Sequence, residues 1–174
     1  IPSRGVWIEI DSDPDGAVYV KIDRKRRFPV TSLLRVLGAP TDAQILTRFK
    51  AGPSHEAIQA TLAADNAKTL QEAYVEIYRR LRDGDIATGN AAQDHVAAIL
   101  SSERYDLSKV GRFHFNRRWG LPIGDKDLSQ STLSLDDMVR IVTQIAESNA
   151  NPAALGDDID HLGFRRVRFV GELL

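Results

Sequence analysis

The sequence predicts an α+β fold, in which an N-terminal β-hairpin or small antiparallel sheet is followed by a mainly helical lobe. Residues 6–22 alternate apolar and polar side chains on either side of the turn Asp13-Pro14-Asp15-Gly16, as the strands of a hairpin do. Later segments instead place apolar residues at helical spacing behind capping residues. Because strands and helices do not alternate along the chain, an α+β arrangement is favoured over a doubly wound parallel sheet.

The predicted hairpin has one aliphatic face and one polar face. Every second residue is aliphatic from Val6 to Ile10, and again from Val18 to Ile22. Successive side chains of a strand point to opposite faces of a sheet. The alternation therefore places four residues on the face away from the aliphatic core: Trp7, Glu9, Tyr19 and Lys21.

Capping residues and apolar stripes predict the helices. A short helix follows Pro29 and ends before Gly38 and Pro40. Two capping boxes, Thr41 with Gln44 and Thr69 with Glu72, predict helices over about 42–49 and about 70–82. Further on, Asn90 is predicted to cap a helix through Leu100, and Ser134 a helix that precedes a linker at 149–156.

Two segments lack a clear prediction of secondary structure. Residues 50–68 contain the break Gly52-Pro53 and at most a turn of helix. The stretch Arg104–Trp119 is notable only for five basic residues against one acidic residue.

Composition restricts the class of protein. The 174 residues are 43% apolar and 27% charged, which is typical of a soluble globular domain and argues against disorder or coiled coil. No apolar run reaches the length of a membrane span, no basic and apolar sequence at the start suggests a signal peptide, and there is no cysteine. We expect a cytoplasmic protein without membrane contact. The start at Ile1-Pro2 and the stop at Leu174 suggest a single domain, residues 1–174, cut from a longer polypeptide.

The charge balance bears on possible nucleic-acid contacts. The net charge of −1 excludes a uniformly basic nucleic-acid-binding protein, so any such contact must be local. Of the 23 basic residues, 17 are arginine, the residue that suits bidentate recognition of phosphates and bases. A GC-rich genome would produce the same bias.

The sequence contains no catalytic motif. The four histidines form no HxH or HExxH pair, and there is no GxSxG, P-loop or GxGxxG sequence. Asp157, Asp158 and Asp160 could in principle hold Mg²⁺, but an acidic loop before a basic stretch is more often used for capping and local ion pairing. We expect neither catalytic residues nor a metal or cofactor in this chain.

Several residues have side chains that could bind single-stranded nucleic acid. An aromatic side chain on the polar face of a sheet, such as Trp7, can stack on an unpaired base, although burial under another domain explains it equally well. The run Arg24–Arg27 is typical of a solvated face. Asp160 can accept from N1–H and N2–H₂ of guanine while a nearby arginine of the set Arg165, Arg166 and Arg168 donates to O6 and N7.

Five blocks in colinear order carry a resemblance to a known family, and together they extend over essentially the whole chain. They are Ile1-Pro2-Ser3-Arg4-Gly5-Val6-Trp7, residues 21–29, residues 77–82, residues 104–112, and residues 157–163 with Arg165-Arg166 and residues 170–173. In these blocks the chain resembles the lobe of the β subunit of bacterial DNA-directed RNA polymerase.

The resemblance implies a role at DNA. In that family the lobe forms one jaw of the main cleft and faces the downstream duplex and the non-template strand, one base of which stacks on an aromatic residue beside a pocket for a flipped guanine. Trp7 matches the stacking residue, and Asp160 and Arg165 match residues of the pocket. The DNA-binding residues that we predict are Trp7, Asp160, Arg165, Arg4, Arg24, Arg26 and Arg166.

The resemblance also implies partners and a place in the cell. The partners are DNA, the polymerase subunits α, β′ and ω, and a σ factor, in the nucleoid region of the cytoplasm. The Mg²⁺-binding aspartates of the parent nucleotidyltransferase lie on a different subunit in that family, and the remainder of the guanine pocket lies beyond Leu174.

Two departures from the family pattern affect these expectations. Phe164 stands where the family has Asn, which bears on the aim of Arg165, and residues 83–87 replace a Pro-Gly-Glu-Pro-Pro turn. A competing hypothesis is a protein-interaction module that docks other subunits or a transcription factor. Salt discriminates between the two, because binding dominated by phosphate contacts weakens steeply with salt whereas apolar docking responds little.

Overall fold

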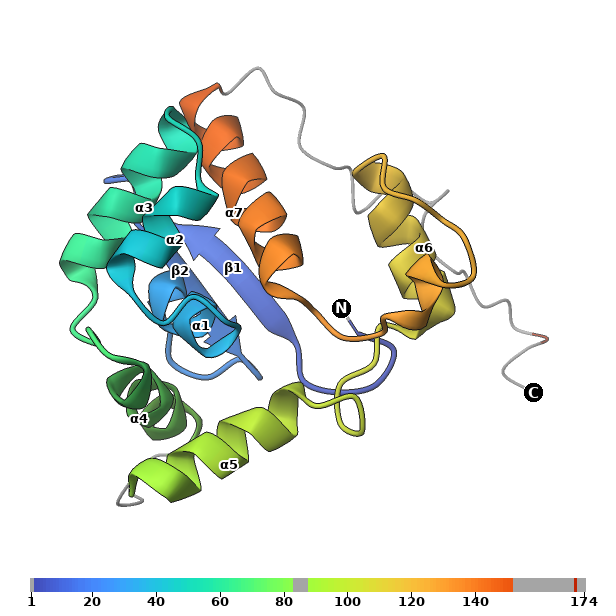
Figure 1. Ribbon diagram of the computed structural model, residues 1–174, viewed down its shortest axis with the longest axis horizontal. Helices are drawn as coiled ribbons and strands as arrows, with labels where there is room; N and C mark the ends of the chain where they lie inside the picture. The colour runs from blue at the N-terminus through green and yellow to red at the C-terminus, as the bar shows by residue number, and fades with distance from the viewer. Residues whose placement is uncertain (1, 83–87, 152–170, 172–174) are drawn as a thin grey trace.

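The computed structural model describes residues 2–82, 88–151 and 171. A three-stranded antiparallel sheet lies among helices, which confirms the α+β prediction (Figure 1). Within the described ranges no helix is long and apolar enough to cross a bilayer. The elements are β1 Ile8–Ser12, β2 Val18–Ile22, β3 Phe28–Pro29, α1 Val30–Val36, α2 Asp42–Arg48, α3 Pro53–Ala64, α4 Leu70–Leu81, α5 Gly89–Leu100, α6 Ser108–Arg118, the 3₁₀ turn η1 Asp127–Ser129, and α7 Leu135–Ala150.

The sheet confirms the predicted hairpin and adds a short third strand. β1 and β2 pair in antiparallel register, with Ile8 opposite Ile22 and Ile10 opposite Val20. Gly16 closes the turn with φ 87°, a conformation that glycine adopts without steric cost. β3 contributes only Phe28 and Pro29 to the sheet and continues directly into α1, so the sheet and the first helix are one continuous stretch of chain.

The hydrophobic core lies between the aliphatic face of the sheet and the helices. α1 and α3 pack against β2, α7 packs against both β1 and α3, and α4 packs against α1 on its other side. α5 is paired with α4, and among the elements α6 packs chiefly against η1 (Figure 1). The largest fully buried apolar side chains are Phe28, Ile22, Leu33, Leu34, Ile45, Ile58, Ile77 and Met138.

Capping boxes begin three of the helices, α2, α4 and α7, at the predicted cap residues. In each, the side chain of the cap accepts from the backbone N–H three residues later, and that residue's side chain accepts from the backbone N–H of the cap. The sequence analysis identified only the cap of the third one. The three pairs are Thr41 with Gln44, Thr69 with Glu72, and Ser134 with Asp137.

The predicted start of α5 is wrong by two residues. Thr88, not Asn90, is the N-cap residue, and Asn90 lies inside the first turn. A Cβ at Gly89 would lie 1.8 Å from Nε2 of Gln71, the far end of an exposed side chain on α4. The first backbone hydrogen bond of the helix runs from the N–H of Ala92 to the carbonyl of Thr88 at 3.0 Å, and no side chain caps it, so the polar side chain of Asn90 does not mark the helix start.

Two helices were not predicted. α3 begins at Pro53 behind Gly52, whose φ is 140°, so the Gly-Pro pair that reads as a break is a helix start with proline in the first turn. α6 follows Asp106, whose carboxylate accepts from the N–H of Ser108 at 2.7 Å, and the Ser108 hydroxyl accepts from Gly111 at 3.3 Å.

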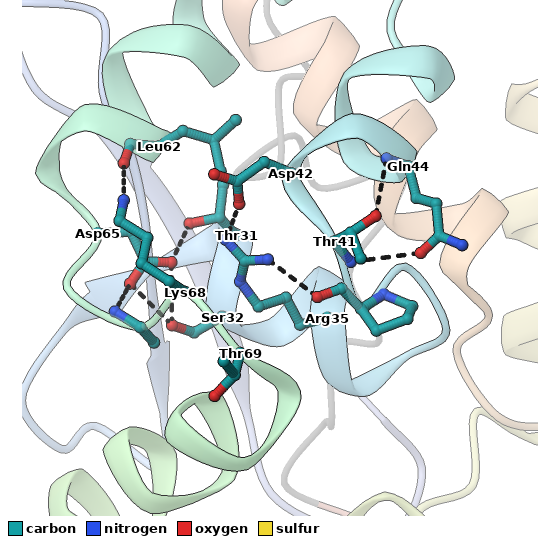
Figure 2. A network of polar contacts seen from close by, with 12 residues as sticks. Thr31, Ser32, Arg35, Thr41, Asp42, Gln44, Leu62, Asp65, Lys68 and Thr69 are labelled. Carbon is teal, nitrogen blue, oxygen red and sulfur yellow. Dashed lines mark hydrogen bonds and ion pairs between the residues drawn. The ribbon is translucent and has the colours of Figure 1, made fainter.

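A buried carboxylate joins α1 to the connection between α3 and α4. Asp65 is 2% exposed and accepts from the hydroxyls of Thr31 (2.5 Å) and Ser32 (3.2 Å) on α1 (Figure 2). It also accepts from the backbone N–H of Ala67 at 2.9 Å. Nearby, the Lys68 ammonium donates to the carbonyl of Leu62 at 2.8 Å. These bonds hold α1, the end of α3 and the start of α4 in one arrangement.

A buried arginine fixes the other end of α1. Arg35 is 1% exposed and donates from Nη1 to the carbonyl of Pro40 at 3.0 Å and from Nη2 to Asp42 (Figure 2). The guanidinium thereby ties the loop after α1 to the first residue of α2. The sequence analysis assigned no role to either Arg35 or Asp65, because each pairs with residues that its local pattern does not identify.

Substitution of Asp65 by Ala should destabilise the protein. It leaves the Thr31 and Ser32 hydroxyls and the Ala67 N–H buried without their acceptor, so we expect the free energy of unfolding to fall by about 2–4 kcal/mol. Urea unfolding followed by circular dichroism measures the loss. Asp136→Ala is the matched control, because its ion pair with Arg48 is solvent-exposed and should contribute about 1 kcal/mol or less. Equal losses in the two variants would contradict the structural role of Asp65.

His95 should make stability depend on pH. Burial lowers the pKa of its imidazole below the usual 6.5, and the charges of Arg82 and Arg104 lower it further. The unfolded chain takes up the proton near pH 6.5 and the folded chain only at lower pH, so the free energy of unfolding falls as the pH drops below 6.5. His95→Phe keeps an aromatic ring beside Tyr78 and should remove this part of the loss. Urea midpoints at about pH 7.5 and about pH 5.5 test it, and identical losses in both proteins would refute it.

Candidate nucleic-acid interface

The segment before β1 is joined to a distant part of the chain by backbone hydrogen bonds. The N–H groups of Ser3 and Arg4 donate to the carbonyl of Asp106 at 2.8 and 3.0 Å, and the Asp106 N–H donates to the carbonyl of Arg4 at 2.8 Å. Gly5 makes this approach possible, since a Cβ there would lie 2.6 Å from the carbonyl oxygen of Arg104. The start of the polar face is thereby held at the chain segment that leads into α6.

Trp7 lies outside the hydrophobic core, as strand alternation predicts. Its side chain is 40% exposed, whereas Phe28 on the opposite side of the sheet is 1% exposed. The carbonyl of Trp7 accepts from the N–H of Asp23 at 2.8 Å, one step beyond the β1–β2 ladder. Trp7 is therefore held by its backbone at the end of the sheet while part of its ring remains accessible.

An unusual turn follows β2. Asp23 and Arg24 both have positive φ, 55° and 57°, and the N–H of Lys25 donates to the carbonyl of Ile22 at 3.1 Å. Positive φ at both central residues is the pattern of a type I′ turn, in which Asn-Gly is the usual pair. Here the chain adopts that turn with two residues that carry long or charged side chains.

The turn brings an arginine onto the tryptophan. The guanidinium carbon of Arg24 lies 4.9 Å from the centroid of the Trp7 ring, within the distance of a cation–π contact. A second such pair lies on the hairpin, where the guanidinium carbon of Arg27 is 4.4 Å from the ring centroid of Tyr19. The first pair involves a residue of the turn, which the sequence analysis did not predict.

Two cations of the hairpin region, Lys21 and Arg27, are neutralised by carboxylates. Lys21 donates to Asp11 at 2.8 Å, and Arg27 donates to both oxygens of Asp13 at 2.6 and 3.0 Å. These hydrogen bonds raise the pKa of Lys21 and of Arg27. The two acidic side chains are thus engaged locally, and the described residues contain no group of three His, Cys, Asp or Glu side chains that could hold a metal ion.

The remaining predicted site residues divide into two sets. Arg4 is exposed and donates from Nη2 to the carbonyl of Ser102 at 3.4 Å, and Arg26 is exposed in the run after β2. Asp160, Arg165 and Arg166 lie outside the described residues, as does Phe164. The structure therefore brings Trp7 and Arg24 together and leaves the predicted proximity of Trp7 to Asp160 and Arg165 a prediction.

A buried ion pair supports the region behind this interface. Arg112 on α6 is 2% exposed and donates to Asp137 at 2.9 Å and to the carbonyls of Gln130 (2.7 Å) and Thr132 (2.5 Å). A cavity of about 300 Å³ lies beside it, and the side chain of Arg140 lines it. All three nitrogens of the guanidinium have partners, so Arg112 ties α6 to the start of α7 and is not available to a ligand.

The described part of the interface can bind a planar group beside positive charge. Trp7 offers a partly exposed π face, and Arg24 supplies a guanidinium that is fixed over that ring. Stacking of this kind accepts any base, because every base has a π face.

Comparison with known families finds a match over nearly the whole chain. The family model described as RNA polymerase Rpb2, domain 2, matches residues 1–168. The match includes Trp7, Arg24 and the acidic and basic residues near position 160.

Trp7 should be dispensable for folding. Trp7→Ala removes a partly exposed ring that is not part of the core, so we expect the free energy of unfolding to fall by about 1 kcal/mol. Phe28→Ala removes a fully buried ring from the same small sheet and should cost about 3–5 kcal/mol. Urea unfolding of the two variants gives the comparison. A loss for Trp7→Ala as large as that for Phe28→Ala would mean that the tryptophan is retained for stability alone.

Proposed function

The chain belongs to the RNA polymerase Rpb2 domain 2 family, the lobe of the second-largest subunit of DNA-directed RNA polymerase, and on that premise we propose that it contacts DNA in the main cleft of the enzyme. The role is non-catalytic: the lobe guides the downstream duplex and binds the non-template strand of the transcription bubble. One observation carries the proposal, namely the partly exposed indole of Trp7 with the Arg24 guanidinium beside it.

The charge distribution supports a local contact. The chain has a net charge of −1, yet the run Arg24–Arg27 follows the polar face of the hairpin, and all four of its residues are exposed. A strand whose base stacks on Trp7 would place its phosphates near these cations. Arg4 and Arg26 complete the set that we propose for phosphate contacts.

We propose that residues in the segment after α7 recognise one base of the non-template strand. Asp160 can accept from the N1–H and N2–H₂ of an unpaired guanine, and Arg165 and Arg166 can donate to its acceptors. This part of the proposal rests on the chemistry of the residue types and on the family resemblance. On the same grounds we propose that the domain belongs to a bacterial polymerase, which contains α, β′ and ω subunits, binds a σ factor and acts at the nucleoid in the cytoplasm.

A second function, docking of protein partners, is favoured by a different surface. Val110 on α6 is 65% exposed and Ile123 in the following loop is 50% exposed, although α6 packs chiefly against η1. Other parts of the polymerase would bury these apolar side chains in the assembled enzyme. This surface is separate from Trp7 in the sequence, so both functions can belong to one domain.

Variants of the assembled polymerase test the DNA contact. Trp7→Ala should shorten the lifetime of open complexes by an amount equivalent to about 1–3 kcal/mol, with little dependence on which base occupies the stacked position. Asp160→Ala should cost about 1–3 kcal/mol only on templates with guanine at the pocket position of the non-template strand. Lifetimes are measured on templates that differ at one non-template base. Unchanged lifetimes for Trp7→Ala on every template would refute the stacking role, and equal effects of Asp160→Ala on all bases would reduce that residue to a structural cap.

A further inference from the structure

We infer that Arg24 is a positioning residue for Trp7. Its guanidinium occupies one face of the indole, so that the other face is presented to the stacked base. The inference rests on the proposed function, since it concerns how the same tryptophan binds a strand of DNA. It differs from a general phosphate contact because Arg24 would act through the ring of Trp7.

The first step of the argument is the connection between the two residues. The backbone of Trp7 is bonded to the turn through the N–H of Asp23 at 2.8 Å, and the turn itself is closed by the bond from Lys25 to Ile22 at 3.1 Å. Arg24 is the residue between Asp23 and Lys25, so its Cα is held at a fixed place relative to the tryptophan. From this Cα the side chain reaches the indole, with its guanidinium carbon 4.9 Å from the ring centroid.

The second step is the backbone conformation of Arg24. Its φ of 57° is one that L-residues with a Cβ adopt only with strain, and glycine is the usual residue at the second central position of such a turn. Asp23, at φ 55°, belongs to a residue type that tolerates this region better. A strained conformation that persists where glycine would relieve it indicates that the side chain is used. The contact that the structure gives the side chain of Arg24 is the one with Trp7.

The third step concerns what the stack does to the tryptophan. A guanidinium is planar and can lie flat on an aromatic ring, whereas the ammonium of lysine is a point charge without a plane. With one face covered by Arg24, the ring cannot tilt toward that side, and a base must approach from the opposite face. The result is a layered arrangement of guanidinium, indole and base, with the positive charge close to the phosphates of the same strand.

A double-mutant cycle in the assembled polymerase separates this role from a phosphate contact. The variants are Arg24→Ala, Trp7→Ala and the double variant, and the measurement is the open-complex lifetime on an intact template. A second set of templates carries a single abasic site at successive non-template positions in the bubble, which identifies the stacked base and removes it. Arg26→Ala is the matched control, because it removes the same charge two residues further along the chain.

We expect Arg24→Ala to shorten the lifetime about two- to fivefold, the equivalent of an exposed cation–π contact of about 0.5–1 kcal/mol at 1.4 kcal/mol per tenfold. The effect should vanish in the Trp7→Ala background and on the template that lacks the stacked base. The effect of Arg26→Ala should instead add to that of Trp7→Ala. Arg24→Lys, which keeps the charge and loses the planar stack, should recover only part of the lifetime lost in Arg24→Ala.

Two results would overturn the inference and leave the proposed function intact: Arg24→Ala without effect while Trp7→Ala shortens the lifetime, or additive effects of the two with Arg24→Lys restoring the wild-type lifetime. If neither Trp7→Ala nor Arg24→Ala alters any lifetime, both the proposed function and the inference fail.

Two further measurements exclude misfolding as the cause. Arg24→Gly removes the side chain but suits the positive φ of the turn, so it should preserve the fold and still shorten the lifetime. In the 174-residue chain with Trp119→Phe, only Trp7 contributes indole fluorescence. There, Arg24→Ala and Arg24→Gly should both increase quenching of Trp7 by acrylamide, whereas Arg26→Ala should not, and equal quenching in all variants would refute the stack.

Discussion

The buried carboxylate of Asp65 is the contact on which the arrangement of the domain depends. It accepts from two hydroxyls of α1 and from a backbone N–H between α3 and α4, so one side chain fixes three helices. A buried charge is tolerated only while its partners are in place, which means that α1 cannot rotate or slide without exposing an unpaired group. Because β3 continues directly into α1, the orientation of the sheet relative to the helices follows from the same contact.

The candidate interface is built from connections that this framework holds in place. Trp7 precedes β1, Arg24 lies in the turn after β2, and Arg4 is bonded through its backbone to Asp106. Loops that are anchored at both ends by hydrogen bonds can present polar and aromatic side chains without disturbing the core. This division explains why the aliphatic face of the sheet serves stability while its other face offers an exposed indole and several guanidinium groups.

The bonds from Ser3 and Arg4 to Asp106 join two of the blocks that carry the family resemblance. Two of the blocks that carry it, residues 1–7 and residues 104–112, are almost a hundred positions apart but are joined by three backbone hydrogen bonds. In the second block Arg112 is buried and satisfied by Asp137 and two carbonyls, so this arginine serves the fold. An arginine-rich sequence does not distinguish such structural residues from those on the polar face, because the difference lies in what surrounds each side chain.

By itself the sequence determined the features that depend on neighbours a few residues apart: the hairpin, the capping boxes at Thr41 and Thr69, the cap at Ser134, and the face on which Trp7 lies. These follow from periodicity and from hydrogen bonds within one turn of helix. The three-dimensional structure alone decided that Gly52-Pro53 starts a helix, that α5 begins before Asn90, and that Arg24 covers Trp7. The first needs the positive φ of Gly52, and the second follows the backbone bond from Ala92 to Thr88 and not a side-chain cap. The third needs a turn whose strained backbone the residues Asp23 and Arg24 do not signal, and which brings the chain after β2 next to the residue before β1.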